Sequence, residues 1–302
     1  MFRSLRFVAA LSVSAMALPL LSASGAFASP ATPQCIVSLS ATATDTLFTI
    51  GAGPQVRAVD KDSGLPAKGL PTTRIDALNP SVEAIVGICK KTPTHPSTKP
   101  DLVIISYDAN SIKAKLRALG VKVVEQDAAT SLAGALGQIK QLGVLSGHVV
   151  AARKEASSIA RSIARDVAAV PAHRTKNLNV YYEIDPTGYS VTSGTFVGAL
   201  LKSLGVVNIA DAQATSADAG YPQLNPEYVV AANPQLVFLS DGATPTALAQ
   251  RPGFSALSAV QNGHVVVLNP NIAEEWGVQL ANLMNRLSAA VKATLADPRP
   301  WR

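Results

Sequence analysis

Short β-branched runs alternate with helix-like stretches along this 302-residue chain, and the whole series occurs twice. Such alternation is typical of parallel sheets covered by helices, because a helix must carry the chain back to the start of each new parallel strand. The sequence therefore predicts an α/β fold in two halves. The strand candidates are residues 36–39, 56–59, 102–106 and 121–125, then 178–184, 206–209, 236–240 and 264–268.

The two halves also resemble each other in detail. Residues 99–106 read KPDLVIIS and residues 233–240 read NPQLVFLS. Upstream of each run stands an Asn-Pro pair, at 79–80 and 225–226, which predicts a capped helix start with proline at the first helical position. From Glu83 to Pro100 the chain advances 17 residues and from Glu227 to Pro234 it advances 7, so the first half holds about ten more. We assign the surplus to a loop over 87–98, which contains His95.

One amphipathic helix is predicted between the halves. Apolar residues recur at helical spacing, while Lys154, Arg161, Arg165 and Asp166 occupy other faces. At 1.5 Å per residue this helix extends about 30 Å, the width of a small domain. We therefore expect a lobe over 35–147, a connecting helix over 148–171 and a second lobe over 175–302. The apolar stripe comprises Ala156, Ile159, Ala160, Ile163, Val167 and Val170.

The first residues have the pattern of a secretory signal peptide. Arg3 and Arg6 precede an apolar run over 7–21, and the small residues Ala26 and Ala28 on either side of Phe27 predict cleavage after Ala28. The run is shorter than the roughly 20 residues that a bilayer-spanning helix needs. We expect residues 1–28 to be removed and the mature protein to be exported, periplasmic or extracellular, and soluble.

Charge gives little support for nucleic-acid binding. Removal of residues 1–28 would lower the net charge from +6 to +4, and the basic residues are scattered without interleaved aromatic residues. We expect a monomer without a nucleic-acid partner.

Export also permits disulfides, and the chain has only two cysteines, Cys35 and Cys89. A Cys35–Cys89 bridge is favoured over two free thiols. It would lie at the amino end of the first sheet, opposite the carboxyl ends of the strands.

Several short motifs, taken in order, resemble the periplasmic binding proteins for vitamin B12, ferric siderophores and haem. They are the opening run IVSLSATATDTLF at 36–48, IGAG at 50–53, NPSVEAI at 79–85, YSVTSGTF at 189–196, YPQLNPE at 221–227 and RPGF at 251–254. Ala41 and Asp45 depart from the family's proline and glutamate. The resemblance covers residues 35–295 and implies two Rossmann-like lobes joined by a single long α-helix, with the ligand cleft between them.

The resemblance implies a substrate-binding protein of an ABC importer, which is not an enzyme. It would capture a bulky metal chelate, cobalamin or a ferric siderophore or haem, and dock to a membrane permease. Glu83 and Glu227 stand where the family places its docking glutamates. An alternative role for both is to complement the dipoles of their helices. No resident cofactor is expected.

Five residues are expected at the ligand. Thr42 lies in the opening motif, and Tyr107, Tyr189, Tyr221 and Trp276 fall on loops at the predicted cleft side of the sheets. Flat rings at a cleft suit a corrin, a porphyrin or a catecholate. No arginine cluster follows Pro270, which favours neutral cobalamin over an anionic siderophore. Tyr181, Tyr182 and Tyr228 are expected in the core.

Two other functions remain alternatives. A zinc or manganese transport protein would need converging histidines, but the four histidines are dispersed along the chain at His95, His148, His173 and His264, so no metal site is expected. An exported α/β hydrolase would need a nucleophile motif, and Gly-x-Ser-x-Gly is absent from the sequence. Ser193 beside Gly194 is the nearest candidate nucleophile, and no local feature supplies its base.

Overall fold

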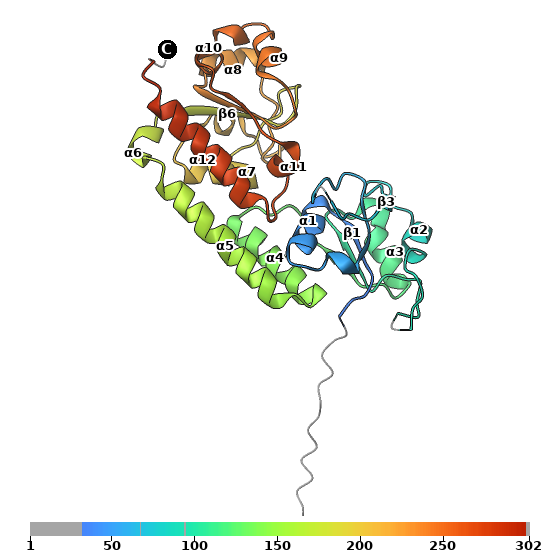
Figure 1. The fold of residues 1–302 in the computed structure, drawn as a ribbon. Helices are drawn as coiled ribbons and strands as arrows, with labels where there is room; N and C mark the ends of the chain where they lie inside the picture. The colour runs from blue at the N-terminus through green and yellow to red at the C-terminus, as the bar shows by residue number, and fades with distance from the viewer. Residues whose placement is uncertain (1–31, 67, 94, 300–302) are drawn as a thin grey trace, which may run out of the picture. The chain divides into compact units, whose positions relative to one another are not determined.

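Two parallel β-sheets form the framework of the computed structural model, which describes residues 32–66, 68–93 and 95–299. Figure 1 labels β1 and β3 in the first sheet and β6 in the second. The first sheet has the strand order β3-β2-β1-β4-β5 and the second has the order β7-β6-β8-β9. Every pairing within the two sheets is parallel, which confirms the predicted fold class. The strands are β1 (Ile36–Leu39), β2 (Val56–Asp60), β3 (Arg74–Ile75), β4 (Leu102–Ile105), β5 (Val123–Glu125), β6 (Asn179–Glu183), β7 (Val207–Asn208), β8 (Leu236–Leu239) and β9 (Val265–Val267).

Helices cover both faces of each sheet, so the central strands β4 and β8 are apolar throughout. In β4, Leu102 and Ile104 face one hydrophobic core, and Val103 and Ile105 face another. Continuous apolar runs of this kind are what burial on both faces of a parallel strand demands. The helices are α1 (Ala41–Thr49), α2 (Val82–Val86), α3 (Ile112–Ala118), α4 (Leu132–Ser146), α5 (Val149–Ala168), α6 (Ala172–Thr175), α7 (Phe196–Ser203), α8 (Pro226–Ala232), α9 (Pro245–Ala249), α10 (Ser258–Asn262), α11 (Pro270–Ala273) and α12 (Leu280–Ala296).

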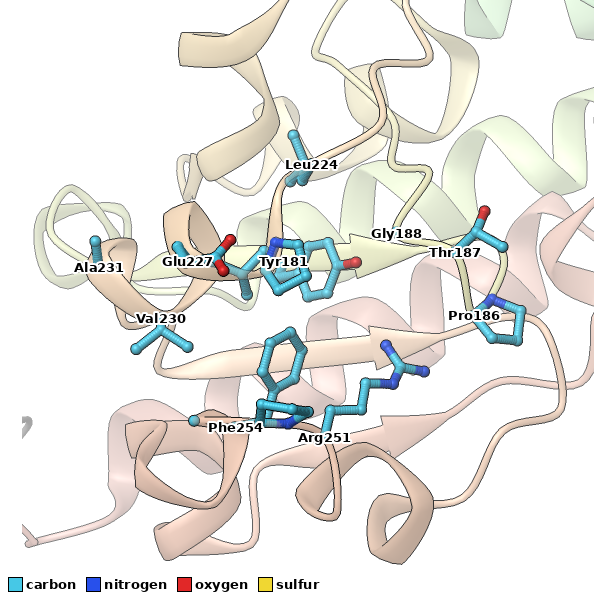
Figure 2. A pocket seen from close by; sticks show the side chains of 14 residues that line it. Tyr181, Pro186, Thr187, Gly188, Leu224, Glu227, Val230, Ala231, Arg251 and Phe254 are labelled. Carbon is cyan, nitrogen blue, oxygen red and sulfur yellow. The ribbon is translucent and has the colours of Figure 1, made fainter.

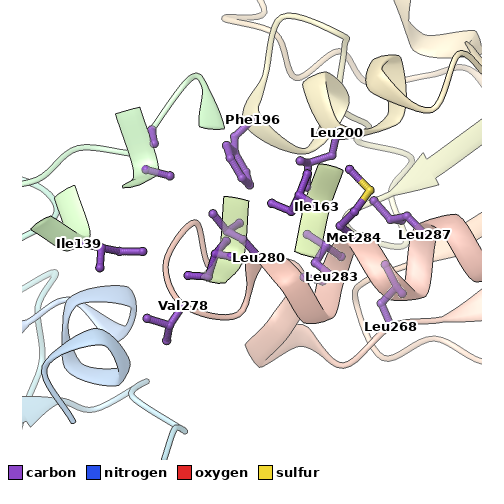
Figure 3. Packing of buried hydrophobic residues seen from close by; sticks show 14 of the residues in the cluster. Ile139, Ile163, Phe196, Leu200, Leu268, Val278, Leu280, Leu283, Met284 and Leu287 are labelled. Atoms are coloured by element: carbon purple, nitrogen blue, oxygen red, sulfur yellow. The ribbon is translucent and has the colours of Figure 1, made fainter. Parts of the chain in front are cut away.

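The long helix predicted between the halves is α5, which has 20 residues. Ala156, Ile159 and Ile163 are buried as expected, and α5 packs against α4 and α12. Figure 3 shows Ile163 of α5 among Leu280, Leu283 and other side chains of one cluster. This cluster also contains Ile36 of β1 and Phe238 of β8, so a single core runs through α5 from one sheet to the other. The boundaries of the two lobes given above stay a prediction.

Two local predictions were wrong. Asp166 was placed on an outer face of the connecting helix but is buried, and its Oδ2 atom has no hydrogen-bond partner. The first Asn-Pro pair does not begin a helix, because Ser81 caps α2 by accepting a hydrogen bond from the Ala84 amide at 3.2 Å. The second pair is as predicted, and the Asn225 side chain accepts from the Glu227 amide at 2.8 Å.

The predicted disulfide is present. Cys35 and Cys89 are bridged with their Cα atoms 6.2 Å apart. Asp101, just before β4, accepts hydrogen bonds from the Cys35 amide at 3.0 Å and stands 3.2 Å from the Nε2 atom of buried His95. The bridge and this histidine therefore fasten the 87–98 loop at the amino end of the first sheet.

Residues 1–28, the predicted signal peptide, lie outside the described residues. Among the described residues, no helix has both the length and the apolar character needed to cross a bilayer.

Candidate functional site

Two recesses share a wall at the carboxyl ends of the strands. The first, which we call the apolar recess, encloses about 310 Å³. The second, which we call the acidic recess, encloses about 190 Å³. Glu274, Glu275 and Trp276 line both. In open α/β sheets ligands bind outside the carboxyl ends of the strands, so this pair of recesses is the candidate site.

The acidic recess draws its lining from both halves of the chain. Ser40, Asp60 and Ser106 come directly after or at the end of the neighbouring strands β1, β2 and β4. Pro270 and Asn271 come from α11, which follows β9. The parallel order of the first sheet brings the three strand ends together, although they are far apart in sequence. The remaining lining residues are Ala41, Thr42 and Asp62.

The apolar recess is built on the second sheet. Tyr182 and Ile184 come from the end of β6, and Phe196 and Val197 begin α7. Ala128, from the loop after β5, is its contribution from the first half. Val191, Tyr221 and Ala273 complete the lining. Aromatic and aliphatic walls of this kind suit a flat, apolar ligand surface.

The shared wall is anchored to the first half by three contacts. The Trp276 indole donates to Gln138 Oε1 of α4 at 2.8 Å, and Gln279 Nε2 donates to Asp45 Oδ2 of α1 at 2.6 Å. Between them, a Cβ at Gly277 would stand 2.8 Å from Thr42 Cγ2, so the segment passes α1 at a distance that only glycine permits. The wall therefore has a defined position relative to α1 and α4.

Four carboxyl groups in or beside this wall have raised pKa values. Burial, with Asp45 and then Glu274 nearby, raises the pKa of Glu275 to about 8. Burial also raises the pKa of Asp45, against the lowering effect of the Gln279 hydrogen bond, and burial alone raises that of Glu274. Burial followed by the neighbouring Asp62 raises the pKa of Asp60. Removal from water disfavours the charged form in each case, and neighbouring carboxylates add to this effect for Glu275 and Asp60.

The predicted ligand residues divide into two groups. Thr42 lines the acidic recess, Tyr221 the apolar recess and Trp276 both. Tyr107 and Tyr189 are 65% and 40% exposed and line neither recess. Tyr189 pairs with Gln223 in an antiparallel bridge, two residues from Tyr221.

Sequence reasoning missed the carboxylates and Phe196. Two features of the sequence could have indicated the carboxylates. They are the Asp60-Lys61-Asp62 run at the end of a strand and the Glu274-Glu275 pair beside Trp276.

Glu83 and Glu227 are the second residues of α2 and α8, and both are exposed. The amide of Glu83 and the Ser81 hydroxyl, whose oxygen is 3.1 Å from Glu83 Oε2, hold the pKa of that carboxyl below its usual value. Both glutamates therefore occupy a helix's first turn, where a negative charge complements the helix dipole.

A third recess, of about 570 Å³, lies beside Glu227 (Figure 2). Its walls are mostly apolar, with Phe254 and Val230 among the lining residues, and Arg251 is its basic member. Arg251 donates to both carboxylate oxygens of Glu183, which has no exposed surface, at 2.6 and 2.8 Å. The Tyr181 hydroxyl donates to the same carboxylate at 2.9 Å. This ion pair between half-buried Arg251 and buried Glu183 fixes one wall of the recess.

The candidate nucleophile and the histidines considered for the alternative functions lie apart from the recesses. The Ser193 hydroxyl donates to Asp211 at 2.6 Å, and the same carboxylate accepts from the Ser193 amide at 2.6 Å. His264 stands 2.9 Å from Asp297, far along the chain from His95 and its partner Asp101. Across the ranges that the structure describes, no three histidine, cysteine or carboxylate side chains gather as a metal site.

Comparison with known proteins gives one family and several relatives. The family model described as periplasmic binding protein matches residues 36–272. A cobalamin-binding protein of Halobacterium salinarum is 28% identical over 273 residues, which are 87% of this chain and 70% of that protein.

Two solved structures have the same fold. The periplasmic vitamin B12-binding protein BtuF of Vibrio cholerae superposes with a TM-score of 0.72 at 22% identity, over 88% of this chain and 99% of that one. The periplasmic haem-binding protein RhuT of Roseiflexus sp. RS-1 has a TM-score of 0.72 at 21% identity, over 87% and 99% of the two chains. At these identities the likeness shows the fold alone.

Proposed function

The chain belongs to the periplasmic binding protein family, and we propose that it is the substrate-binding protein of an ABC importer that captures a corrinoid. The observation that carries the proposal is the shared wall at Trp276, where an apolar recess and an acidic recess meet at the strand ends of both sheets. A corrin has an apolar ring face and a polar rim of amides, so one ligand of this class matches both recesses. The cobalamin-binding relative agrees with this choice.

In this proposal the ring stacks beside Trp276 and Tyr221, and Thr42 contacts its polar rim. Trp276 is well suited to the role because its hydrogen bond to Gln138 fixes the indole before a ligand arrives. Tyr107 and Tyr189 retain a lesser role at the rim, where their exposed rings can meet the part of a bulky ligand that protrudes.

Binding is tested by titrating the purified protein with cyanocobalamin, haem and a ferric siderophore, followed by absorption and intrinsic fluorescence. We expect cyanocobalamin to bind, and W276A and Y221A each to weaken it by about 1–3 kcal/mol, the loss of one buried aromatic contact. Y107A is the control, because Tyr107 is an exposed ring that lines neither recess. It should change the affinity for cyanocobalamin less than threefold, which is about 0.6 kcal/mol. Binding of haem or the siderophore in place of cyanocobalamin would contradict the corrinoid assignment.

We further propose that Glu83 and Glu227 dock onto basic residues of the permease. They are exposed, acidic and equivalently placed at the second position of helices α2 and α8. Charges at the rim of an interface steer association and orient the partners. The third recess, beside Glu227, offers an apolar socket for a neighbouring permease side chain.

Docking is tested by uptake of labelled cyanocobalamin into cells that express the importer with this protein. The double variant E83K/E227K should keep its cyanocobalamin affinity and lose most uptake. E155K, on α5, is the matched control and should retain uptake. Unchanged uptake by E83K/E227K would leave both glutamates with the alternative role of complementing helix dipoles.

A further inference from the structure

The acidic recess has an unbalanced set of charged side chains. Four carboxyl groups line it, from Asp60, Asp62, Glu274 and Glu275, and none of its lining residues is Lys, Arg or His. Two cations lie nearby, outside the lining. Lys61 pairs with Asp76 at 3.0 Å, and Arg74 donates to the backbone carbonyls of Ser63 at 2.6 Å and of Asp60 at 3.4 Å. An anionic group entering the recess would therefore meet carboxyl groups and no cationic lining residue.

Among these four carboxyl groups, Glu275 is the one whose surroundings indicate that a ligand binds in the recess. Its side chain belongs to a residue only 6% exposed, it lines the recess, and its Oε2 atom has no hydrogen-bond partner. A buried carboxyl oxygen without a partner is unfavourable, and an incoming hydrogen-bond donor would relieve that deficit. The neighbouring contacts of Trp276 and Gln279 hold the segment in place, so Glu275 does not need to move to meet a ligand.

The donor set around Glu275 suits an organic group better than a bare metal ion. In the part of the chain that the structure describes, these carboxyls do not come together in a cluster that could hold a metal. The other polar groups in the lining, at Ser40, Thr42 and Ser106, are hydroxyls, and Asn271 adds an amide. Hydroxyl, amide and carboxyl groups together form the hydrogen-bonding environment that a primary amide or an ammonium group requires.

We propose that the acidic recess is a selectivity subsite, in which Glu275 accepts a hydrogen bond from a neutral or cationic N–H group of the ligand, and Asp60, Asp62 and Glu274 exclude anionic groups. The inference rests on the proposed function and deepens it. In this proposal the subsite distinguishes ligands by the chemical groups on their rim, and not by their metal or their ring. Corrinoids with intact side-chain amides fit the subsite, and chelates with rim carboxylates do not.

Two matched pairs of probes test the subsite. Dicyanocobinamide and dicyanocobyrinic acid share a corrin ring and differ in carrying amides or carboxylates. Ferrioxamine B carries a free ammonium group, whereas ferric citrate is anionic. Each is titrated at pH 7 against the wild-type protein, E275Q, the double variant D62N/E274Q and the control E155Q on α5. Asp62 and Glu274 are exposed, so their replacement removes charge without disturbing the core.

We expect dicyanocobinamide to bind the wild-type protein about 100-fold more tightly than dicyanocobyrinic acid, because Asp60, Asp62 and Glu274 repel carboxylates on the rim of the acid. D62N/E274Q should lower this ratio of affinities about tenfold, because the variant should bind dicyanocobyrinic acid more tightly. E155Q should leave the ratio unchanged. E275Q should weaken dicyanocobinamide less than tenfold, since glutamine still accepts a hydrogen bond.

Equal affinity for the two corrinoids, or a ratio that D62N/E274Q leaves unchanged, would overturn the subsite and leave the proposed function standing. If only the iron chelates bind, the corrinoid assignment fails. In that case a preference for ferrioxamine B over ferric citrate would still support the subsite, and the reverse preference would overturn it. Binding of none of the four probes would refute both.

Discussion

The burial of Glu275 predicts an unusual dependence of stability on pH. Its pKa is raised from 4.5 to about 8 in the folded protein, so the folded state retains a proton that the unfolded state releases. The free energy of unfolding should therefore fall as pH rises from 4.5 to 8, by about 1.4 kcal/mol for each pH unit. The full loss is about 4–5 kcal/mol, and it is complete above pH 8. Asp45 and Glu274, whose pKa values are also raised, act in the same direction.

The substitution E275Q isolates this effect, because glutamine resembles the protonated carboxyl and does not ionise. At pH 5 the variant and the wild-type protein should differ by less than about 1 kcal/mol. At pH 8 the variant should be more stable by several kcal/mol, and its Tm should be about 10 °C higher. E155Q is the control for removing one carboxylate from the surface of α5.

Urea unfolding at pH 5, 6, 7 and 8, followed by circular dichroism, measures the effect directly. The expected result is a difference between E275Q and wild type that widens with each step in pH. A constant difference across this range, or a wild-type protein whose stability rises through it, would refute the reasoning from burial.

Three further predictions concern stability and are checked by chemical denaturation. Replacing Cys35 and Cys89 together with alanine should destabilise the protein by about 4 kcal/mol, since the bridge closes a loop with a sequence separation of 54; equal midpoints with and without reductant in the wild type would contradict this. R251M should destabilise by about 3–5 kcal/mol, because it leaves the carboxylate of Glu183 buried without its partner, and the double variant R251M/E183L should recover part of the loss. G277A should destabilise by about 1–3 kcal/mol through overpacking against α1, and a midpoint equal to that of the wild type would show that the segment can move aside.

Much of the framework followed from local pattern. The central strands β4 and β8 are apolar at every position and β1 at all but Ser38, and α5 carries its buried residues at helical spacing, so length and periodicity were enough to place them. The short edge strands β3 and β7 have two residues each and no such pattern. The strand at Val207–Asn208 was predicted too long, over 206–209, and the strand at Arg74–Ile75 was not predicted. Pairing at the edge of a sheet depends on the neighbouring strand rather than on the segment itself.

The candidate site was only partly predictable. Trp276, Tyr221 and Thr42 line the recesses and were among the predicted ligand residues, because the sequence shows aromatic and motif residues on loops after strands. Their contact with a ligand stays a prediction. The carboxylates were not found, since Asp60 and Glu275 are more than two hundred residues apart in sequence and meet only through the packing of α1 against the 274–279 segment.

The α/β class, the duplication and the connecting helix could be inferred from the sequence, because each depends on local periodicity. Two cysteines allow one pairing, but that the bridge forms in place of two free thiols came from the structure. The structure was also needed to show that Tyr107 and Tyr189 lie outside the recesses and that the buried Oε2 atom of Glu275 has no hydrogen-bond partner. Burial and charge depend on which atoms surround a group in three dimensions, and the electrostatic character of the cleft became apparent only when the strand ends of both sheets were brought together.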